Sequence, residues 1–141
     1  MRQAQTLNEA QLRRVIQYCR SRRHPTRDET IILTSFYAGL RAKEIAALKI
    51  GNVFDEGGNV REQFILSAAQ SKGGHTRTVY LNQRLRKALG DYGAIKYLGD
   101  PQRPLFESQK GGHFSANTMC QLFLDIYKAV GLKDASSHSG R

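Results

Sequence analysis

Apolar residues return at helical spacing near the start of the chain. The stripe with the i, i+3, i+4, i+7 pattern of a helix with one buried face consists of Leu12, Val15, Ile16 and Cys19. Thr6 and Glu9 have the spacing of a capping box, in which the threonine oxygen caps the helix and the glutamate reaches back. The pattern therefore predicts a helix from Thr6 to about Arg22, ended by the approach of a proline.

A second apolar run has a wider buried face. Thr26 and Glu29 are spaced like another capping box, and the run from Arg27 to Ala38 is apolar around much of its circumference. This run is the predicted central core helix. Gly39 can adopt the left-handed backbone that ends such a helix. A short apolar helix follows, so we expect Arg41 at a corner between two buried elements.

Between residues 52 and 81 the apolar period changes to that of strands. Three short segments have this period and are separated by turn residues: Val53–Phe54, Phe64–Ala68 and Arg77–Leu81. They predict a three-stranded antiparallel sheet. The loop between the last two strands contains glycines, which places Lys72 at the tip of a hairpin.

Two further capped helices complete the pattern. Asn82 can cap a helix from Gln83 to about Leu98, although its two glycines weaken it enough to allow a break in the middle. Ser115 can cap a helix from Ala116 to Val130. No repeat or linker divides the chain, so we predict a single domain over residues 1–141. Its predicted class is α+β, mainly helical, with the helices packed around the small sheet.

Charge narrows the choice of function. The 141-residue chain carries 22 Lys and Arg against 12 Asp and Glu, a formal net charge of +10. An excess of this size in a short chain favours a polyanionic partner, and nucleic acid is the usual one. A membrane surface fits less well, because the first helix only partly matches a basic amphipathic helix. No apolar run is long enough to span a bilayer.

The two cysteines, Cys19 and Cys120, are too few for a disulfide scaffold and lack the spacing of metal ligands. We expect both to be buried, reduced thiols. The N-terminal segment has no apolar stretch of the kind found in secretory signals. These features together favour a cytoplasmic protein.

The Arg41 corner is the first candidate for chemistry. A guanidinium keeps its charge, so a partly buried one needs a carboxylate or a phosphate as partner. Glu44 lies three residues further on and would share a helical face with Arg41. The plain alternative is therefore a structural ion pair between Arg41 and Glu44.

Two more clusters are candidates. Lys72 and Arg77 lie at and just behind the hairpin tip, where an ordinary exposed turn lysine is the plain alternative. His138 and Arg141 would share one face if a serine before them caps a helix, against the alternative of a frayed tail. Two arginines, a lysine and a histidine around a phosphate suit phosphoryl transfer without a metal, because they bind its oxygens, neutralise developing charge and move protons.

In this order the clusters resemble the catalytic domain of tyrosine recombinases, the phage-integrase class of site-specific recombinases. GLRAKEIAAL is similar to that family's first arginine box, SKGGHTRTVYL to its lysine hairpin and SSHSGR to the start of its His-x-x-Arg box. The resemblance covers essentially the whole chain. The three boxes together are much more specific than the arginine box alone.

The resemblance implies a reaction on double-stranded DNA. The family cuts one strand with a tyrosine, which leaves a 3′-phosphotyrosyl link and a free 5′-hydroxyl that attacks a partner strand's link, without ATP, metal or another cofactor. By match, Arg41 and Arg141 would clamp the scissile phosphate and His138 would help to move the proton. Lys72 would act as general acid to the leaving 5′-oxygen, and Glu44 would support the arginine site. The resemblance also implies a homotetramer on DNA.

The sequence departs from the family pattern in three places. Gly140 stands where the family usually has an apolar residue, and Tyr80 where it often has proline. The family's third box and nucleophilic tyrosine are expected after the second box, and none of the six tyrosines lies there. We therefore expect these 141 residues to bind DNA without cutting it by themselves. One alternative is a non-catalytic DNA-binding remnant of an integrase. A weaker one is a basic RNA-binding domain, because the sequence shows no aromatic platform of the kind that single strands need.

Overall fold

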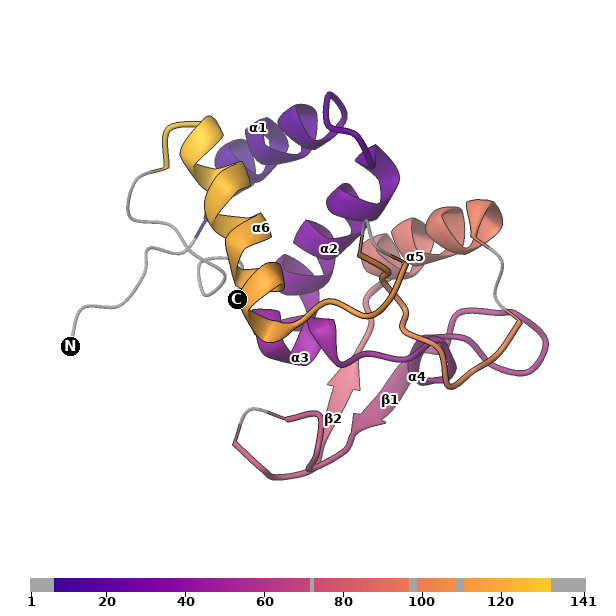
Figure 1. Ribbon diagram of the computed structural model, residues 1–141. Coiled ribbons are helices and arrows are strands. Elements are labelled where there is room, and N and C mark those ends of the chain that lie inside the picture. Colours follow the sequence, from indigo (N-terminus) through magenta and orange to yellow (C-terminus); the bar gives the residue numbers. More distant parts are fainter. Residues whose placement is uncertain (1–6, 72, 97–98, 109–110, 133–141) are drawn as a thin grey trace.

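The computed structural model describes residues 7–71, 73–96, 99–108 and 111–132. In chain order its elements are α1 (Glu9–Cys19), α2 (Pro25–Ala38), α3 (Ala42–Ala46), α4 (Ile50–Val53), β1 (Gln63–Leu66), β2 (Arg77–Tyr80), α5 (Gln83–Ile95) and α6 (Ala116–Ala129). Figure 1 shows α2 among the other helices and the β1–β2 hairpin projecting beyond α3. Helix α2 packs against α1 and α5, and α6 packs against α1 and α3. The predicted class, mainly helical α+β with a small antiparallel sheet, is confirmed.

Helix α1 begins later than predicted. Its N-cap is Asn8, whose side chain accepts a hydrogen bond from the Gln11 backbone N–H over 2.8 Å, and the Gln11 side chain accepts from the Asn8 N–H over 3.0 Å. The predicted capping box of Thr6 and Glu9 is therefore wrong, and Thr6 lies outside the described residues. Asparagine caps at least as well as threonine and stands closer to the apolar stripe. The stripe itself is buried as predicted at Leu12, Val15 and Cys19.

Helix α2 begins earlier than predicted. Pro25 occupies its first turn, where the missing N–H is not needed and the fixed φ suits a helix. Thr26 therefore lies inside the helix, and its carbonyl accepts a hydrogen bond from the Thr30 hydroxyl over 2.7 Å. The predicted capping box of Thr26 and Glu29 is wrong for this reason. At the other end Gly39 has φ of 70°, the left-handed conformation predicted for it.

The turn at Gly39 leads directly into α3. Ile45 on α3 and Leu48 just behind it are buried, as are Phe123 and Tyr127 on the facing helix α6. The predicted short apolar helix behind Arg41 is thus confirmed. This packing fixes the start of α3 against the core, and with it the position of the arginine that precedes it.

The sheet has two strands within the described residues, not three. Strands β1 and β2 pair antiparallel, with Phe64 opposite Val79 and Leu66 opposite Arg77. Phe64, Leu66 and Val79 are buried on one face, as the period of two requires. Arg77 closes the ladder on that same face, directly after the loop.

The strand predicted at Val53–Phe54 is wrong. Val53 ends α4, and Phe54 forms an isolated bridge with Val60 rather than a ladder. The side chain of Asp55 accepts hydrogen bonds from two backbone N–H groups within the next four residues. This turn brings the chain back too soon for more than a single pair of residues to form.

Helix α5 is continuous through its two glycines. Asn82 caps it by accepting from the Leu85 N–H over 2.8 Å, and Ser115 caps α6 by accepting from the Thr118 N–H over 3.0 Å, so both predicted caps are confirmed. The predicted break in α5 is absent because its apolar face is buried against α2, and tertiary packing outweighs a weak propensity.

The two thiols lie in different surroundings. Cys19 is buried on α1, as predicted, whereas Cys120 is exposed on α6. The prediction for Cys120 is wrong because that position falls off the stripe that α6 buries, which contains Met119, Leu122, Phe123 and Ile126. No helix within the described part of the chain has both the length and the apolar character needed to cross a membrane.

Candidate functional site

Arg41 stands at the N-cap position of α3. Its backbone is extended, with φ −81° and ψ 160°, because the left-handed turn at Gly39 has just ended α2 and α3 has not yet begun. Its side chain is half-buried. The corner predicted from the sequence is therefore present, with an arginine held between two packed helices.

Glu44 makes this corner rigid. One carboxylate oxygen, Oε1, accepts a hydrogen bond from the Arg41 backbone N–H over 2.9 Å. The same oxygen pairs with Nη2 of Arg77, also at 2.9 Å. Only 2% of the Glu44 side chain is exposed. A buried carboxylate is stabilised by paired charge and by donated N–H groups, and Glu44 has both.

The structural ion pair considered for Arg41 and Glu44 takes a different form. Glu44 contacts the backbone of Arg41, and the guanidinium that pairs with its carboxylate belongs to Arg77. No carboxylate among the described residues forms an ion pair with the Arg41 guanidinium. This leaves the Arg41 charge directed to whatever enters the adjoining cleft.

That cleft lies between α3 and the hairpin loop and has a volume of about 460 Å³. Its lining residues are Arg41, Glu44, Ser71, Gly73, His75, Thr76 and Arg77. Two guanidiniums and an imidazole thus surround a single buried carboxylate, which suits a phosphate with several oxygens to bind.

His75 received no role from the sequence, although it was part of the predicted hairpin. It is exposed and lies at the cleft two residues before Arg77. The signal that could have singled it out is its position in a glycine-containing loop, close to the arginine that begins β2. An imidazole there can donate a hydrogen bond to an anion.

Three of the predicted site residues lie outside the described residues: Lys72, His138 and Arg141. The structure brings together Arg41 and Glu44, and it adds Arg77 to them. The described loop residues on both sides of position 72 line the same cleft.

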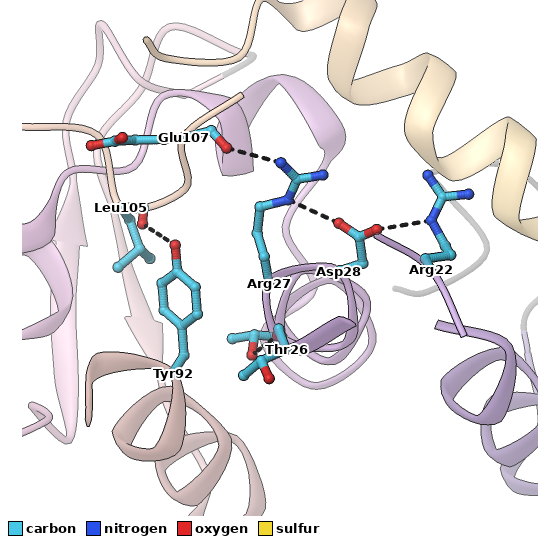
Figure 2. Close-up of polar contacts among 8 residues, drawn as sticks. Arg22, Thr26, Arg27, Asp28, Tyr92, Leu105 and Glu107 are labelled. Atoms are coloured by element: carbon cyan, nitrogen blue, oxygen red, sulfur yellow. Dashed lines mark hydrogen bonds and ion pairs between the residues drawn. The ribbon is translucent and has the colours of Figure 1, made fainter. Parts of the chain in front are cut away.

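A second group of buried charges lies at the start of α2 and is shown in Figure 2. Asp28 accepts from Nε of Arg22 over 2.8 Å and from Nε of Arg27 over 2.9 Å, and 1% of its side chain is exposed. Arg27 also donates to the Glu107 carbonyl over 3.1 Å and lies over the ring of Phe114. The Arg27 guanidinium therefore has its partners within the protein.

A larger hollow, of about 1100 Å³, lies beside α4 and the turn that follows it. Its charged lining residues are Lys49, Asp55, Glu56 and Arg61. Balanced charge of this kind suits a polyanion less well than the smaller cleft at Arg41. No group of three or more His, Cys, Asp or Glu side chains suited to a metal ion occurs within the described residues.

Comparisons with known proteins identify similar sequences and folds. The sequence is 27% identical to the tyrosine recombinase XerC of Pelobacter propionicus over 116 residues, which are 82% of this chain and 36% of that protein. The fold is similar to the XerA recombinase, with a TM-score of 0.75 and 25% identity over 99% of this chain and 48% of that one. The chain thus spans between a third and a half of the length of these relatives.

A further similar structure is the integrase of the Tn1549 transposon in complex with a circular intermediate DNA. Its TM-score is 0.73 at 14% identity, over 99% of this chain and 51% of that one, so it supports the fold alone. The sequence model of the phage integrase family matches residues 5–141. The chain belongs to the phage integrase family.

Proposed function

We propose that the chain binds a phosphate of double-stranded DNA in the cleft at Arg41, as part of a site-specific recombinase. The observation that carries the proposal is the Arg41 guanidinium itself. It is held at a rigid corner, lines an open cleft and has no carboxylate partner among the described residues. Family membership and the DNA in the Tn1549 integrase complex support DNA as the ligand.

The proposed chemistry is strand exchange by two transfers of one phosphoryl group. A tyrosine hydroxyl attacks the scissile phosphorus and loses its proton to His138, the bond to the 5′-oxygen breaks, and that oxygen takes a proton from Lys72. In the second transfer the 5′-hydroxyl of a partner strand attacks the phosphotyrosine and gives its proton to Lys72, and the tyrosine leaves with the proton from His138. Arg41 and Arg141 bind the non-bridging oxygens throughout, His138 moves the proton, and Glu44 holds the corner. Four copies act together on the DNA.

We propose that the nucleophile is not one of the six tyrosines of this chain. Burial raises the pKa of the Tyr92 and Tyr127 phenols, which disfavours the phenolate. Tyr37 is half-buried, with the guanidinium of Arg84 over its ring at 5.3 Å. These observations disfavour Tyr37, Tyr92 and Tyr127 as the nucleophile. They support, as a second candidate function of these 141 residues, DNA binding without cleavage.

DNA binding is tested with the purified chain and a short duplex of random sequence, followed by fluorescence anisotropy across a range of salt concentrations. Arg41→Lys keeps the charge but loses the planar fork, so we expect affinity to fall about tenfold with the melting temperature unchanged. If Arg41→Lys lowers the melting temperature and leaves affinity intact, Arg41 has a structural role and the proposal is wrong.

Cleavage is tested with duplex DNA that carries a nick near the cut site, so that a covalent adduct is trapped. We expect the 141-residue chain to bind this DNA without forming an adduct that survives denaturation. An adduct would mean that one of the six tyrosines is the nucleophile after all. The Tyr→Phe variant that no longer forms the adduct would then identify the nucleophile.

A further inference from the structure

The buried face of the β1–β2 hairpin ends at a charged residue, Arg77. Arg77 pairs with Leu66 in the last pair of the β1–β2 ladder, so its side chain starts from the face that buries Leu66 and Val79. From there it reaches Glu44, which is 33 positions away in the sequence. The contact ties the start of β2, where the loop ends, to helix α3.

One oxygen atom carries this connection. Oε1 of Glu44 accepts both the Arg41 backbone N–H and Nη2 of Arg77, each over 2.9 Å. The Glu44 side chain is 2% exposed, whereas that of Arg77 is 43% exposed. A carboxylate this deeply buried depends on its donors, so a change at Arg77 is passed to the atom that orients the Arg41 backbone.

We propose that Arg77 is a positioning residue of the cleft, which acts through Glu44 to hold Arg41 against the hairpin loop. Nη2 faces Glu44, so this nitrogen is used within the protein. The rival role is a second, independent phosphate ligand, since Arg77 also lines the cleft. The inference rests on the proposed function, in which Arg41 binds a DNA phosphate.

A double-mutant cycle separates the two roles. Arg41→Gln, Arg77→Gln and the double variant are compared for affinity to a short random-sequence duplex, with Arg103→Gln as the matched control. Arg103 is similarly exposed and pairs with Glu107, away from the cleft. If Arg77 acts through Arg41, each single variant weakens binding and reduces the salt slope by about 1, and the double variant is no weaker than Arg41→Gln. Independent ligands would instead give effects that multiply and a slope reduced by about 2.

A readout without DNA keeps this test separate from that of the proposed function. The exchange rate of the Arg41 amide proton, measured by NMR, reports the hydrogen bond to Glu44 directly. We expect Arg77→Gln to raise it more than about threefold, Arg103→Gln to leave it unchanged and Arg77→Lys to restore part of the protection. If Arg77→Gln does not fold, Arg77→Lys replaces it in the cycle, with a smaller change expected both in the amide exchange rate and in the affinity.

The outcomes are distinct. If the unmodified chain does not bind DNA, the proposed function fails, while an accelerated Arg41 amide still establishes the connection through Glu44. If the amide changes and affinity does not, Arg77 is only a structural tie and the positioning role is wrong. If the amide is unchanged, Arg77 does not act through Glu44, whatever its effect on affinity.

Discussion

Two buried carboxylates in this protein lie among arginines, and they contact these arginines in different ways. Asp28 holds Arg22 and Arg27 at the start of α2, and Glu44 holds Arg77 and the backbone of Arg41 at the start of α3. Both carboxylates are almost completely buried. Each therefore needs hydrogen-bond donors to remain charged. The two sites differ in whether a neighbouring arginine side chain remains available to a ligand.

At Asp28 the guanidiniums are enclosed. The Arg27 side chain is 11% exposed, and its Nε and Nη1 donate to Asp28 and to the Glu107 carbonyl, as Figure 2 shows. At Glu44 a backbone N–H takes the place of one guanidinium, so the Arg41 side chain is left for the cleft. An excess of arginine alone thus does not locate a phosphate site. A phosphate site is expected where the hydrogen bonds of a buried carboxylate are made by other donors, so that a neighbouring arginine side chain forms no ion pair with it.

The largest effect expected from this comparison is on stability at Asp28. Asp28→Asn leaves two sheltered guanidiniums without their counter-charge, and breaking a buried pair in this way typically lowers the free energy of unfolding by about 3–5 kcal/mol. Urea denaturation followed by circular dichroism measures the loss. The DNA affinity of the folded fraction should not change, because Asp28 is not part of the cleft.

The matched control for Asp28→Asn is Asp91→Asn. Asp91 pairs with Lys87 on the surface of α5, where an exposed pair contributes less than about 1 kcal/mol. If both variants lose the same small amount of stability, the Asp28 ion pairs do not stabilise the fold as expected of buried pairs. If Asp28→Asn instead abolishes DNA binding by folded protein, the two carboxylates do not have separate roles in stability and in DNA binding.

Local signals in the sequence predicted much of the frame in which both carboxylates lie. The left-handed Gly39, the caps Asn82 and Ser115 and the alternation in the two hairpin strands all act within a few residues, and the structure confirms them. Where two local signals competed, the sequence did not decide between them. Pro25 prevailed over the capping box predicted at Thr26, and the start of α2 moved accordingly.

Contacts between distant residues could not be predicted. The partner of Glu44 is Arg77, 33 positions away, whereas helical spacing had suggested Arg41. Asp28 is different, because Arg22 and Arg27 lie within six positions of it. It was not singled out because a charged residue at the start of a helix is usually exposed. The predicted strand at residues 53–54 failed because a strand needs a partner and the short turn supplied a single bridge.

The next largest effect is on DNA affinity, compared between variants of Arg41 and Arg22. Arg41→Gln should weaken binding to a random-sequence duplex about tenfold, because an arginine fork on a phosphate is lost. Arg22→Gln should weaken it less than about twofold, because that guanidinium pairs with Asp28. Fluorescence anisotropy at several salt concentrations checks both. Equal losses for the two variants would mean that overall positive charge, and not the Arg41 corner, determines affinity.

Alkaline pH should weaken the Asp28 side of the molecule. Burial, aided by the charge of Asp28, raises the pKa of the Cys19 thiol to about 12 from 9.0. Above pH 9 the unfolded chain loses this proton and the folded chain keeps it, so stability is complete below pH 9 and falls as pH rises towards 12. At pH 10 the loss from this thiol is about 1.4 kcal/mol, measured as the difference between the free energies of unfolding by urea at pH 8 and pH 10.

The control for the alkaline effect is Cys19→Ala, which should be less stable throughout but lose less on going from pH 8 to pH 10. Comparing these two changes is necessary because burial lowers the pKa of Lys96, which acts in the opposite direction. The same pH dependence in both proteins would show that Cys19 is ionised or exposed in the folded state, against the buried position found for it.

The smallest effect expected is at Tyr92, whose hydroxyl donates to the Leu105 carbonyl over 2.9 Å near the Asp28 cluster. Tyr92→Phe removes this donor, but the carbonyl still accepts from Lys96 Nζ over 2.7 Å, so it is not left unsatisfied. The free energy of unfolding should therefore fall by only about 0.5–1 kcal/mol, measured by urea denaturation. Tyr80→Phe is the control, because that side chain is exposed and should give no change. A loss above about 2 kcal/mol for Tyr92→Phe would mean that the Lys96 contact does not replace the phenol, and that the polar contacts around Asp28 form one cooperative network.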